Sequence, residues 1–398
     1  MDTRGREQIL PSNSNSGWSP ANIKPGGWFI ILLLLAALAY WGVKHGKTGA
    51  GSGQTAASTD AQSGAGGAAL GGSLSAQQAA NGDIAVSTSG TKQAWLAGEA
   101  AKFNAQNSGH VQMLPAVESR DAMQSILNGK LQPTVWSPSS PVWTERLAQL
   151  RPNMLDESDP QNYRVVFKSP LVFLTTKSKA PALRPILTGT MPWTSLAQAR
   201  RYKFGYADPL NASSGMLTMA LIITEYCRTH GGIDPVQATS SRGFSAFLGR
   251  LNQGLVKTDD QGSSKLEKAY EANPASRDFI TAYENAALTA VAQNPNLTII
   301  YPNPTANADQ GAAVISAPWV TPAQKATAQK FVQFIGSKDA QQDGAQYHFR
   351  PAVNGAQTLG NTLSGAARTN FQASYTSIEL PPYEALNEAA AQYRALLR

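Results

Sequence analysis

The sequence predicts a protein of the α/β class, in which a two-lobed domain follows one N-terminal transmembrane helix and a flexible linker. Residues 28–43 form an unbroken apolar run, residues 46–82 are dominated by small residues, and strand-like runs alternate with helical segments beyond Asp83. Such alternation is typical of a mostly parallel sheet flanked by helices. At 398 residues the chain is long enough for two domains, or for one domain of two lobes.

The apolar run, WFIILLLLAALAYWGV, contains no charged residue. As an α-helix, together with Gly26 and Gly27, it would span about 27 Å, close to the lower limit for crossing a bilayer. Trp28 and Trp41 stand near its two ends, as aromatic residues do at membrane interfaces. We therefore expect a transmembrane helix at residues 28–43.

Residues 1–27 are expected to stay in the cytoplasm, because three basic residues precede the apolar run and only two follow it closely. A cleaved signal peptide is the alternative, since Ala37-Leu38-Ala39 resembles a cleavage site. The long leader and the bulky Tyr40 and Trp41 argue against cleavage. The protein is then a single-pass protein of the cell membrane, with the bulk of the chain extracytoplasmic.

Residues 44–82 are expected to form the flexible linker. Within residues 46–82, twenty-five of thirty-seven residues are Gly, Ala or Ser, and none is aromatic. A segment of this composition cannot bury enough apolar surface to fold.

The folded part begins at Asp83 with a strand-to-helix unit. The run IAVST is typical of a strand, and Trp95, Leu96 and Phe103 then recur at helical spacing. Two similar units follow. The expected strands are 84–88, 111–117 and 134–136, and the expected helices are 91–104, 120–128 and 142–150.

Residues 165–176, VVFKSPLVFLTT, contain two apolar runs separated by Lys168-Ser169-Pro170. Because proline cannot donate to a strand ladder, the sequence predicts a break between two strands and a crossover between lobes. Farther along we expect strands at 203–207 and 297–301, helices at 216–228 and 277–293, and a Pro/Asn-rich return at 302–310.

The last elements have clear boundaries. Thr321 and Pro322 are typical of a helix start, as N-cap and first helical residue, and Gly336 ends that helix. After the proline pair at 381–382, a final helix at 383–397 is expected to pack on the first lobe.

Composition excludes several function classes. The net charge is +7, but the basic residues are scattered, so we expect no nucleic-acid partner. Cys227 lies in an apolar stretch and is expected to be a small buried hydrophobe. The four histidines lack the spacing of a metal site, and no catalytic constellation is recognisable. We expect no metal, no cofactor and no enzymatic activity.

Three turns rich in small hydroxyl residues follow predicted strands: Ser87–Thr91, Ser137–Ser140 and Asn211–Gly215. In parallel sheets, ligands lie beyond the carboxyl ends of the strands, where helix N-termini favour anions or polar groups. The alternative for each turn is that its Ser or Thr only caps the following helix. With three such turns, we expect at least one to contact a ligand.

Several motifs resemble those of bacterial extracellular solute-binding proteins of the periplasmic-binding type II fold, in particular the set found beside von Willebrand factor A domains. The resemblance covers Asp83 to about Pro351. It rests on the order and spacing of Val135–Ser140, Ser169–Phe173, Ala207–Gly215, Tyr301-Pro302, Ala317–Pro322 and Phe349–Pro351.

The resemblance implies two lobes with a ligand cleft between them. The first lobe is built from residues 83–168 and, with the C-terminal helix, 310–398; the second is residues 169–309. Where oxyanion-binding relatives often have an Asp, this chain has Glu284-Asn285, so the ligand class stays open. The family's ligand positions correspond here to Ser87, Ser89, Ser139, Ser140, Ser213, Ser214 and Tyr283.

The sequence thus predicts a membrane-anchored extracytoplasmic protein that captures a small polar or anionic ligand, such as an oxyanion, for a transporter or sensor. Its partners would be a transporter permease or a separate von Willebrand factor A domain protein, since this chain carries no such domain. The alternative is a structural or assembly adaptor of the cell envelope that uses the same fold.

Overall fold

The computed structural model describes residues 74–257 and 262–397. The expected cytoplasmic segment, the transmembrane helix at 28–43 and most of the linker lie outside these residues. Within the described ranges, no helix is both long enough and apolar enough to cross a membrane.

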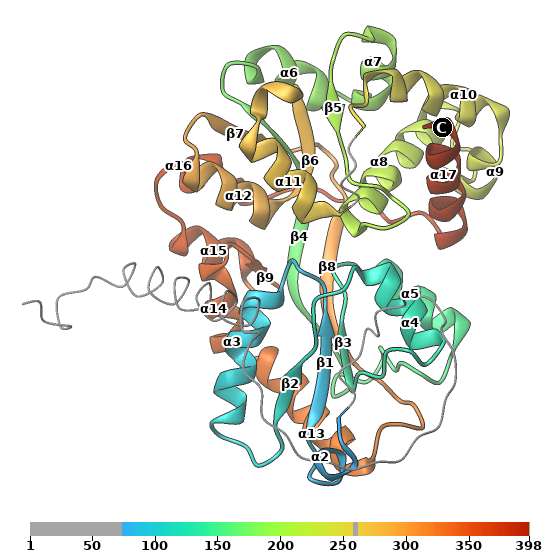
Figure 1. Cartoon of the computed structure of the whole chain (residues 1–398). Coiled ribbons are helices and arrows are strands. Elements are labelled where there is room, and N and C mark those ends of the chain that lie inside the picture. Colours follow the sequence, from blue (N-terminus) through green and yellow to red (C-terminus); the bar gives the residue numbers. More distant parts are fainter. Residues whose placement is uncertain (1–73, 258–261, 398) are drawn as a thin grey trace, which may run out of the picture. The chain divides into compact units, whose positions relative to one another are not determined.

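The sheet of the described residues has nine strands. Figure 1 shows that two lobes share it. Its main path runs β2-β1-β3-β8-β4-β6-β5, and β7 and β9 also pair with β4. The strands are β1 (Ile84–Thr88), β2 (Val111–Met113), β3 (Val135–Ser137), β4 (Tyr163–Thr176), β5 (Phe204–Gly205), β6 (Phe279–Tyr283), β7 (Leu297–Ile300), β8 (Asn307–Val314) and β9 (Arg350–Pro351).

Helices cover both faces of the sheet in each lobe (Figure 1). In lobe 1 they are α2 (Ala76–Ala80), α3 (Gln93–Asn104), α4 (Ser119–Leu127), α5 (Pro141–Leu150), α13 (Pro322–Ile335), α14 (Lys338–Gln346) and α15 (Gly355–Thr362). In lobe 2 they are α6 (Ala180–Leu187), α7 (Pro192–Ala199), α8 (Ser213–Thr229), α9 (Pro235–Thr239), α10 (Arg242–Leu251), α11 (Ser263–Ala272), α12 (Glu284–Gln293), α16 (Gly365–Asn370) and α17 (Tyr383–Leu396).

Strand β4 passes from one lobe to the other. Its first part pairs with β8 as far as Pro170, and from Leu171 onward it pairs with β6. The predicted break at residues 168–170 is therefore wrong, because one continuous strand runs through it. Pro170 lies where β4 changes partner, so its missing N–H removes little from either ladder.

The expectation of a mostly parallel sheet is also wrong. Among the described strands, only β1·β2, β1·β3 and β5·β6 are parallel pairs, whereas the pairs made by β4 and β8 are antiparallel. Part of the predicted return at 302–310 forms β8, which pairs with β3 and β4 in lobe 1. The strands that link the lobes thus make the sheet mixed.

The predicted helix at 277–293 is wrong in its first half. Residues Phe279–Tyr283 form β6, and α12 begins only at Glu284. All five residues of β6 are buried, so the strand shows no alternation of apolar and polar side chains. A short run that is apolar on both faces cannot be distinguished from a helix by its periodicity.

Two further expectations fail at the ends of the folded part. The linker does not extend to residue 82, because Ser75 caps α2 in a capping box and this helix contacts α13. Helix α17 packs mainly on α8, α9 and α10 of lobe 2, and its first residues, Tyr383 and Glu384, also contact α5 of lobe 1. Arg394 of α17 forms an ion pair with Asp208 at 2.6 Å, and Tyr393 lies 5.2 Å from the Tyr206 ring.

Candidate ligand-binding site between the lobes

In lobe 1, Ser87 and Ser89 lie at and just after the end of β1. Ser87 is fully buried and Ser89 is 3% exposed. Among the described residues, neither hydroxyl has a hydrogen-bond partner. A buried polar group without a partner is unfavourable by about 1–3 kcal/mol, so such groups call for a ligand, a water molecule or a movement.

The loop between β3 and α5 carries Ser139 and Ser140, which differ in role. Ser140 is the N-cap of α5, and its hydroxyl accepts the Val142 N–H at 3.4 Å. Ser139 instead donates to the hydroxyl of Ser213 in lobe 2 at 2.9 Å. Its own N–H donates to Ser119 Oγ at 3.1 Å, which holds the loop against α4.

In lobe 2, Ser213 and Ser214 begin α8, three residues before the predicted start of this helix. Ser213 Oγ also accepts the Trp143 Nε1–H at 2.7 Å, a second contact between the lobes. Ser214 turns away to Ser263 of α11, with 2.7 Å between the hydroxyls. Gly215 permits this arrangement, because a Cβ there would lie 2.1 Å from the Ala207 carbonyl oxygen.

Tyr283 completes the contact from the end of β6. Its hydroxyl donates to the Ser139 carbonyl oxygen at 3.4 Å, and the residue is 1% exposed. Burial raises the pKa of Tyr283 well above its usual range, so the phenol remains a neutral donor.

The structure thus brings together three of the seven predicted residues, Ser139, Ser213 and Tyr283, across the two lobes. Ser87 and Ser89 lie in lobe 1 with unpartnered hydroxyls, while Ser140 acts as a helix cap and Ser214 bonds within lobe 2. Small hydroxyl groups, an indole N–H and a phenol can all donate to the oxygen atoms of a polar ligand.

Charged residues near this contact were missed by the sequence reasoning. Glu267 of α11 is 8% exposed, and burial and the charge of Glu271 raise its pKa to about 8. Lys92, the residue before α3, is fully buried, and burial lowers its pKa to about 7. The sequence offered one signal for Lys92, since it precedes the buried Trp95 and Leu96 at helical spacing.

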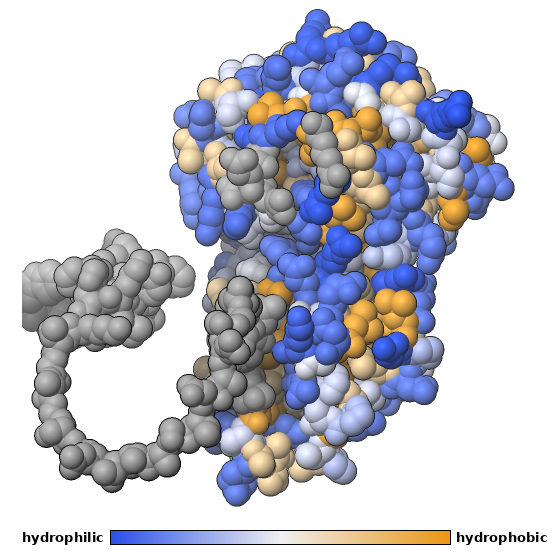
Figure 2. Space-filling view, turned by 45° about the vertical axis from the view of Figure 1, so that its right-hand side comes forward, coloured by the Kyte–Doolittle hydropathy of each residue, from blue (hydrophilic) through white to orange (hydrophobic). Residues whose placement is uncertain are grey.

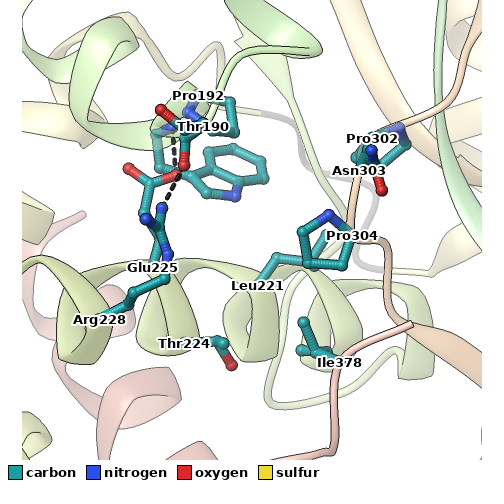
Figure 3. Close-up of a pocket in the computed structure, with 11 residues that line it drawn as sticks. Thr190, Pro192, Leu221, Thr224, Glu225, Arg228, Pro302, Asn303, Pro304 and Ile378 are labelled. Carbon is teal, nitrogen blue, oxygen red and sulfur yellow. Dashed lines mark hydrogen bonds between the residues drawn. The ribbon is translucent and has the colours of Figure 1, made fainter. Parts of the chain in front are cut away.

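A separate small cavity lies within lobe 2, with a volume of about 40 Å³ (Figure 3). Figure 3 shows Glu225, Arg228 and Thr190 on one side of it, and Leu221, Pro304 and Ile378 on another. The Glu225 carboxylate accepts the backbone N–H groups of Trp193 and Thr194 at 3.0 and 2.6 Å, which stabilise the start of α7. Glu225 already has these hydrogen-bond partners, and the cavity has room for little more than a water molecule. We therefore assign no ligand to this cavity.

The described residues include no group of three or more His, Cys, Asp or Glu side chains that could hold a metal ion. On the face shown in Figure 2, the described surface is mainly hydrophilic, with apolar residues in small scattered groups. Polar recognition between the lobes is the most developed binding feature of these residues.

Comparisons with known proteins agree with this architecture. The family profile described as "Bacterial extracellular solute-binding protein" matches residues 84–350, more than half of the chain. No curated protein matches the chain significantly.

Several solved structures share the fold. The sulfate-binding protein SubI from Mycobacterium tuberculosis H37Rv is 17% identical, with a TM-score of 0.54, and the match covers 74% of this chain and 94% of that protein. A periplasmic thiamin-binding protein is 13% identical, with a TM-score of 0.59, covering 79% and 96%. A ferric-binding protein from Campylobacter jejuni is 13% identical, with a TM-score of 0.57, covering 79% and 99%.

At these identities the structural matches establish only the two-lobed α/β fold of periplasmic binding proteins, and the family profile carries the assignment. The chain belongs to the family of bacterial extracellular solute-binding proteins.

Proposed function

We propose that this protein captures a small polar or anionic solute between its two lobes and presents it to an ABC transporter outside the cytoplasmic membrane. The observation that carries the proposal is the hydrogen bond between Ser139 of lobe 1 and Ser213 of lobe 2, at 2.9 Å. It joins two of the three hydroxyl-rich turns, and the unpartnered Ser87 and Ser89 belong to the third.

Strands β4 and β8 connect the lobes, so they are the natural hinge (Figure 1). Rotation about them would separate Ser139 from Ser213 and admit a solute. The solute would then replace the contacts of these hydroxyls with one another, and the lobes would close around it.

The ligands named for the structural neighbours are chemically diverse. They include sulfate, thiamin and iron, and one neighbour is described as an ABC transporter. The fold therefore does not select a solute, and the side chains of this chain must do so. Hydroxyl and phenol donors suit a ligand rich in oxygen acceptors.

The proposal is tested by thermal denaturation of the full chain in detergent. Tm is measured without ligand and with each of sulfate, phosphate, molybdate, amino acids, sugars and thiamin. A ligand at 100 times its Kd adds about 2.7 kcal/mol to the free energy of unfolding, which raises Tm measurably. Native mass spectrometry of the purified protein would identify a retained ligand. If no compound raises Tm at millimolar concentration, the adaptor function replaces the transport function.

We also propose that residues 28–43 anchor the protein in the membrane, with residues 1–27 in the cytoplasm. The uncharged apolar run supports this, because one central Arg would add about 2.5–3.5 kcal/mol to its insertion. A reporter that is active only outside the cytoplasm should work when fused after Gly82 and fail when fused before Lys24. Release of the intact protein by carbonate, or cleavage at Ala39, would contradict the anchor.

The proposed partner is a transporter permease, and a separate von Willebrand factor A domain protein is the second candidate. Cross-linking in membranes followed by mass spectrometry distinguishes them, because a permease and a von Willebrand factor A protein give different peptides. Recovery of neither protein would exclude both partners.

A further inference from the structure

Lys92 is an unusual buried cation. It immediately precedes α3 and is fully buried, and its ammonium donates to the Pro138 carbonyl oxygen at 2.6 Å. Within the described ranges, no carboxylate forms an ion pair with it. Lysines are almost never fully buried without a charged partner, because a protein interior solvates the ammonium poorly.

The position of this ammonium follows from the contacts of Lys92. Its backbone N–H donates to the Ser89 carbonyl oxygen at 3.4 Å, which ties it to the turn after β1. Its ammonium bonds to Pro138, the residue before Ser139. Lys92 therefore lies between the two lobe 1 loops that carry the predicted ligand-binding serines.

A second polar side chain lies on the same side of the sheet. Trp95 and Leu96, three and four residues after Lys92, pack in one hydrophobic cluster with Ala312 and Val314 of β8. Because side chains alternate along a strand, Gln310 shares the face of Ala312. Gln310 is fully buried, and both polar atoms of its amide lack a hydrogen-bond partner among the described residues.

Three of the polar side chains at this end of the lobe 1 sheet are therefore buried and incompletely bonded: those of Ser89, Lys92 and Gln310. They supply one positive charge, one hydroxyl and an amide. Together they make a donor-rich group whose missing partner is an acceptor with negative charge.

We propose that Lys92 recognises the negative charge of the solute and that Gln310 donates a hydrogen bond to it, so that the ligand is a small anion such as an oxyanion or a carboxylate. This inference rests on the proposed function and narrows its ligand class. The anion supplies the counter-charge that the protein lacks around Lys92, and closing the lobes removes both charges from water together.

The competing explanation is that Lys92 only braces the loop through Pro138. In that case, Lys92→Met would destabilise the fold and leave anion binding unchanged. If Lys92 recognises the ligand, Lys92→Met would keep the buried aliphatic stem and remove an unfavourable buried charge. Without added anion, the Tm of this variant should then equal or exceed that of the wild type.

The inference is tested by titration calorimetry of the full chain. The anionic probes are sulfate, phosphate, molybdate and citrate, and glucose is the neutral probe. Lys92→Met should weaken the anion that binds wild type by about 10- to 150-fold, as expected for a hydrogen bond to a charged group. Gln310→Ala should weaken it by roughly 2- to 13-fold. Lys330→Met, at an exposed position on α13, is the matched control and should not change the affinity.

Proton uptake provides a readout that a bracing role would not change. Burial lowers the pKa of Lys92 to about 7, with no ionised group contributing to that shift. Of the charged groups on α3 and α14, Glu99, Lys102 and Asp343 bond among themselves, and Asp309 on β8 interacts with Lys168. At pH 8 an anion should therefore bind with uptake of close to one proton in the wild type and none in Lys92→Met.

Two results would overturn the inference alone. One is tight binding of glucose or another neutral probe without any anion, and the other is anion binding by Lys92→Met within threefold of the wild type. Binding of neither class of probe would instead overturn the proposed function, and this inference with it.

Discussion

Glu267 lies directly behind the contact between the lobes, and its surroundings disfavour the ionised form. It is 8% exposed, its Oε1 has no hydrogen-bond partner among the described residues, and Glu271 and Glu118 add negative charge nearby. Burial and these charges raise its pKa to about 8, although the backbone N–H of Tyr283 opposes the shift. Glu267 is therefore largely protonated in the folded protein at neutral pH.

We predict that Glu267→Gln stabilises the protein increasingly as pH rises. Between pH 4.5, the usual pKa of a Glu, and pH 8, the folded state holds a proton that the unfolded state has released, so wild-type stability falls as pH increases. Glutamine removes this dependence. Denaturant unfolding at pH 5 and pH 8 should show the variant gaining roughly 1–3 kcal/mol over the wild type across this interval.

The exposed Glu388 provides the control for this experiment. Glu388→Gln should follow the wild-type curve within about 0.5 kcal/mol. If Glu267→Gln and the wild type showed the same pH dependence, the carboxyl would be ionised in the fold, and our description of its environment would be wrong.

At the scale of single residues, the sequence predicted hydroxyl-rich turns but not what each hydroxyl does. Ser140 and Ser139 are neighbours, yet one caps a helix and the other reaches the opposite lobe. This difference depends on which lobe packs nearby, and local sequence carries no such information. Lys92 and Glu267 escaped notice for the same reason, because burial of a charged residue is a property of the tertiary structure.

At the scale of elements, the start of β9 and the start of α12 are joined by a buried ion pair. Arg350 donates to both Glu284 carboxylate oxygens, at 3.0 and 2.5 Å, and Tyr301 donates to the same carboxylate at 2.7 Å. Arg350 also donates to the carbonyl oxygens of Gln372 and Ala373. The pair links lobe 1 to lobe 2 beside the crossing strands.

We predict that Glu284→Ala costs about 3–5 kcal/mol in the free energy of unfolding, because it leaves Arg350 buried without a counter-charge. The matched control is Glu384→Ala, which removes the partner of Arg146 in an ion pair whose carboxylate is 56% exposed. It should cost less than about 1 kcal/mol. Equal costs for the two substitutions, measured by denaturant unfolding, would refute the role of the buried pair.

We also predict that Gly215→Ala destabilises the protein by about 2 kcal/mol or more, because its Cβ would lie 2.1 Å from the Ala207 carbonyl oxygen and force α8 away from that loop. Gly98→Ala is the control, since nothing lies within 4 Å of a Cβ there. In the middle of α3, it should stabilise by roughly 0.5–1 kcal/mol. Thermal melting should therefore shift in opposite directions, and a common direction would contradict this packing.

The elements that the sequence predicted well are those with local signals. The strand at 84–88, and the start of α13 with Thr321 as N-cap and Pro322 as its first residue, agree with the structure. Elements fixed by long-range pairing were missed or misread: β6 is buried on both faces, β8 has a run of small residues, and β4 tolerates Pro170 because it changes partner there. Strand pairing, not propensity, decides these segments.

At the scale of the whole described domain, the two lobes share one mixed sheet and meet through polar contacts. Arg120 of α4 donates to the Leu210 carbonyl oxygen at 2.7 Å, in addition to the contacts that Ser213 makes with Ser139 and Trp143. A contact built from hydrogen bonds can open at modest cost, because water replaces the partners of each group. This is the property that capture and release of a solute require.

Capture between the lobes is tested most directly by titrating the full chain with the ligand found in the thermal panel. The titration compares the wild type with Ser139→Ala, Ser213→Ala and the exposed control Ser178→Ala. Loss of a neutral hydrogen bond should raise Kd by roughly 2- to 13-fold in the first two variants, and by more if the ligand is charged. Ser178→Ala should bind as the wild type does. If Ser139→Ala and Ser213→Ala lowered Tm but left Kd unchanged, the serines would only hold the lobes together, and the solute would bind elsewhere.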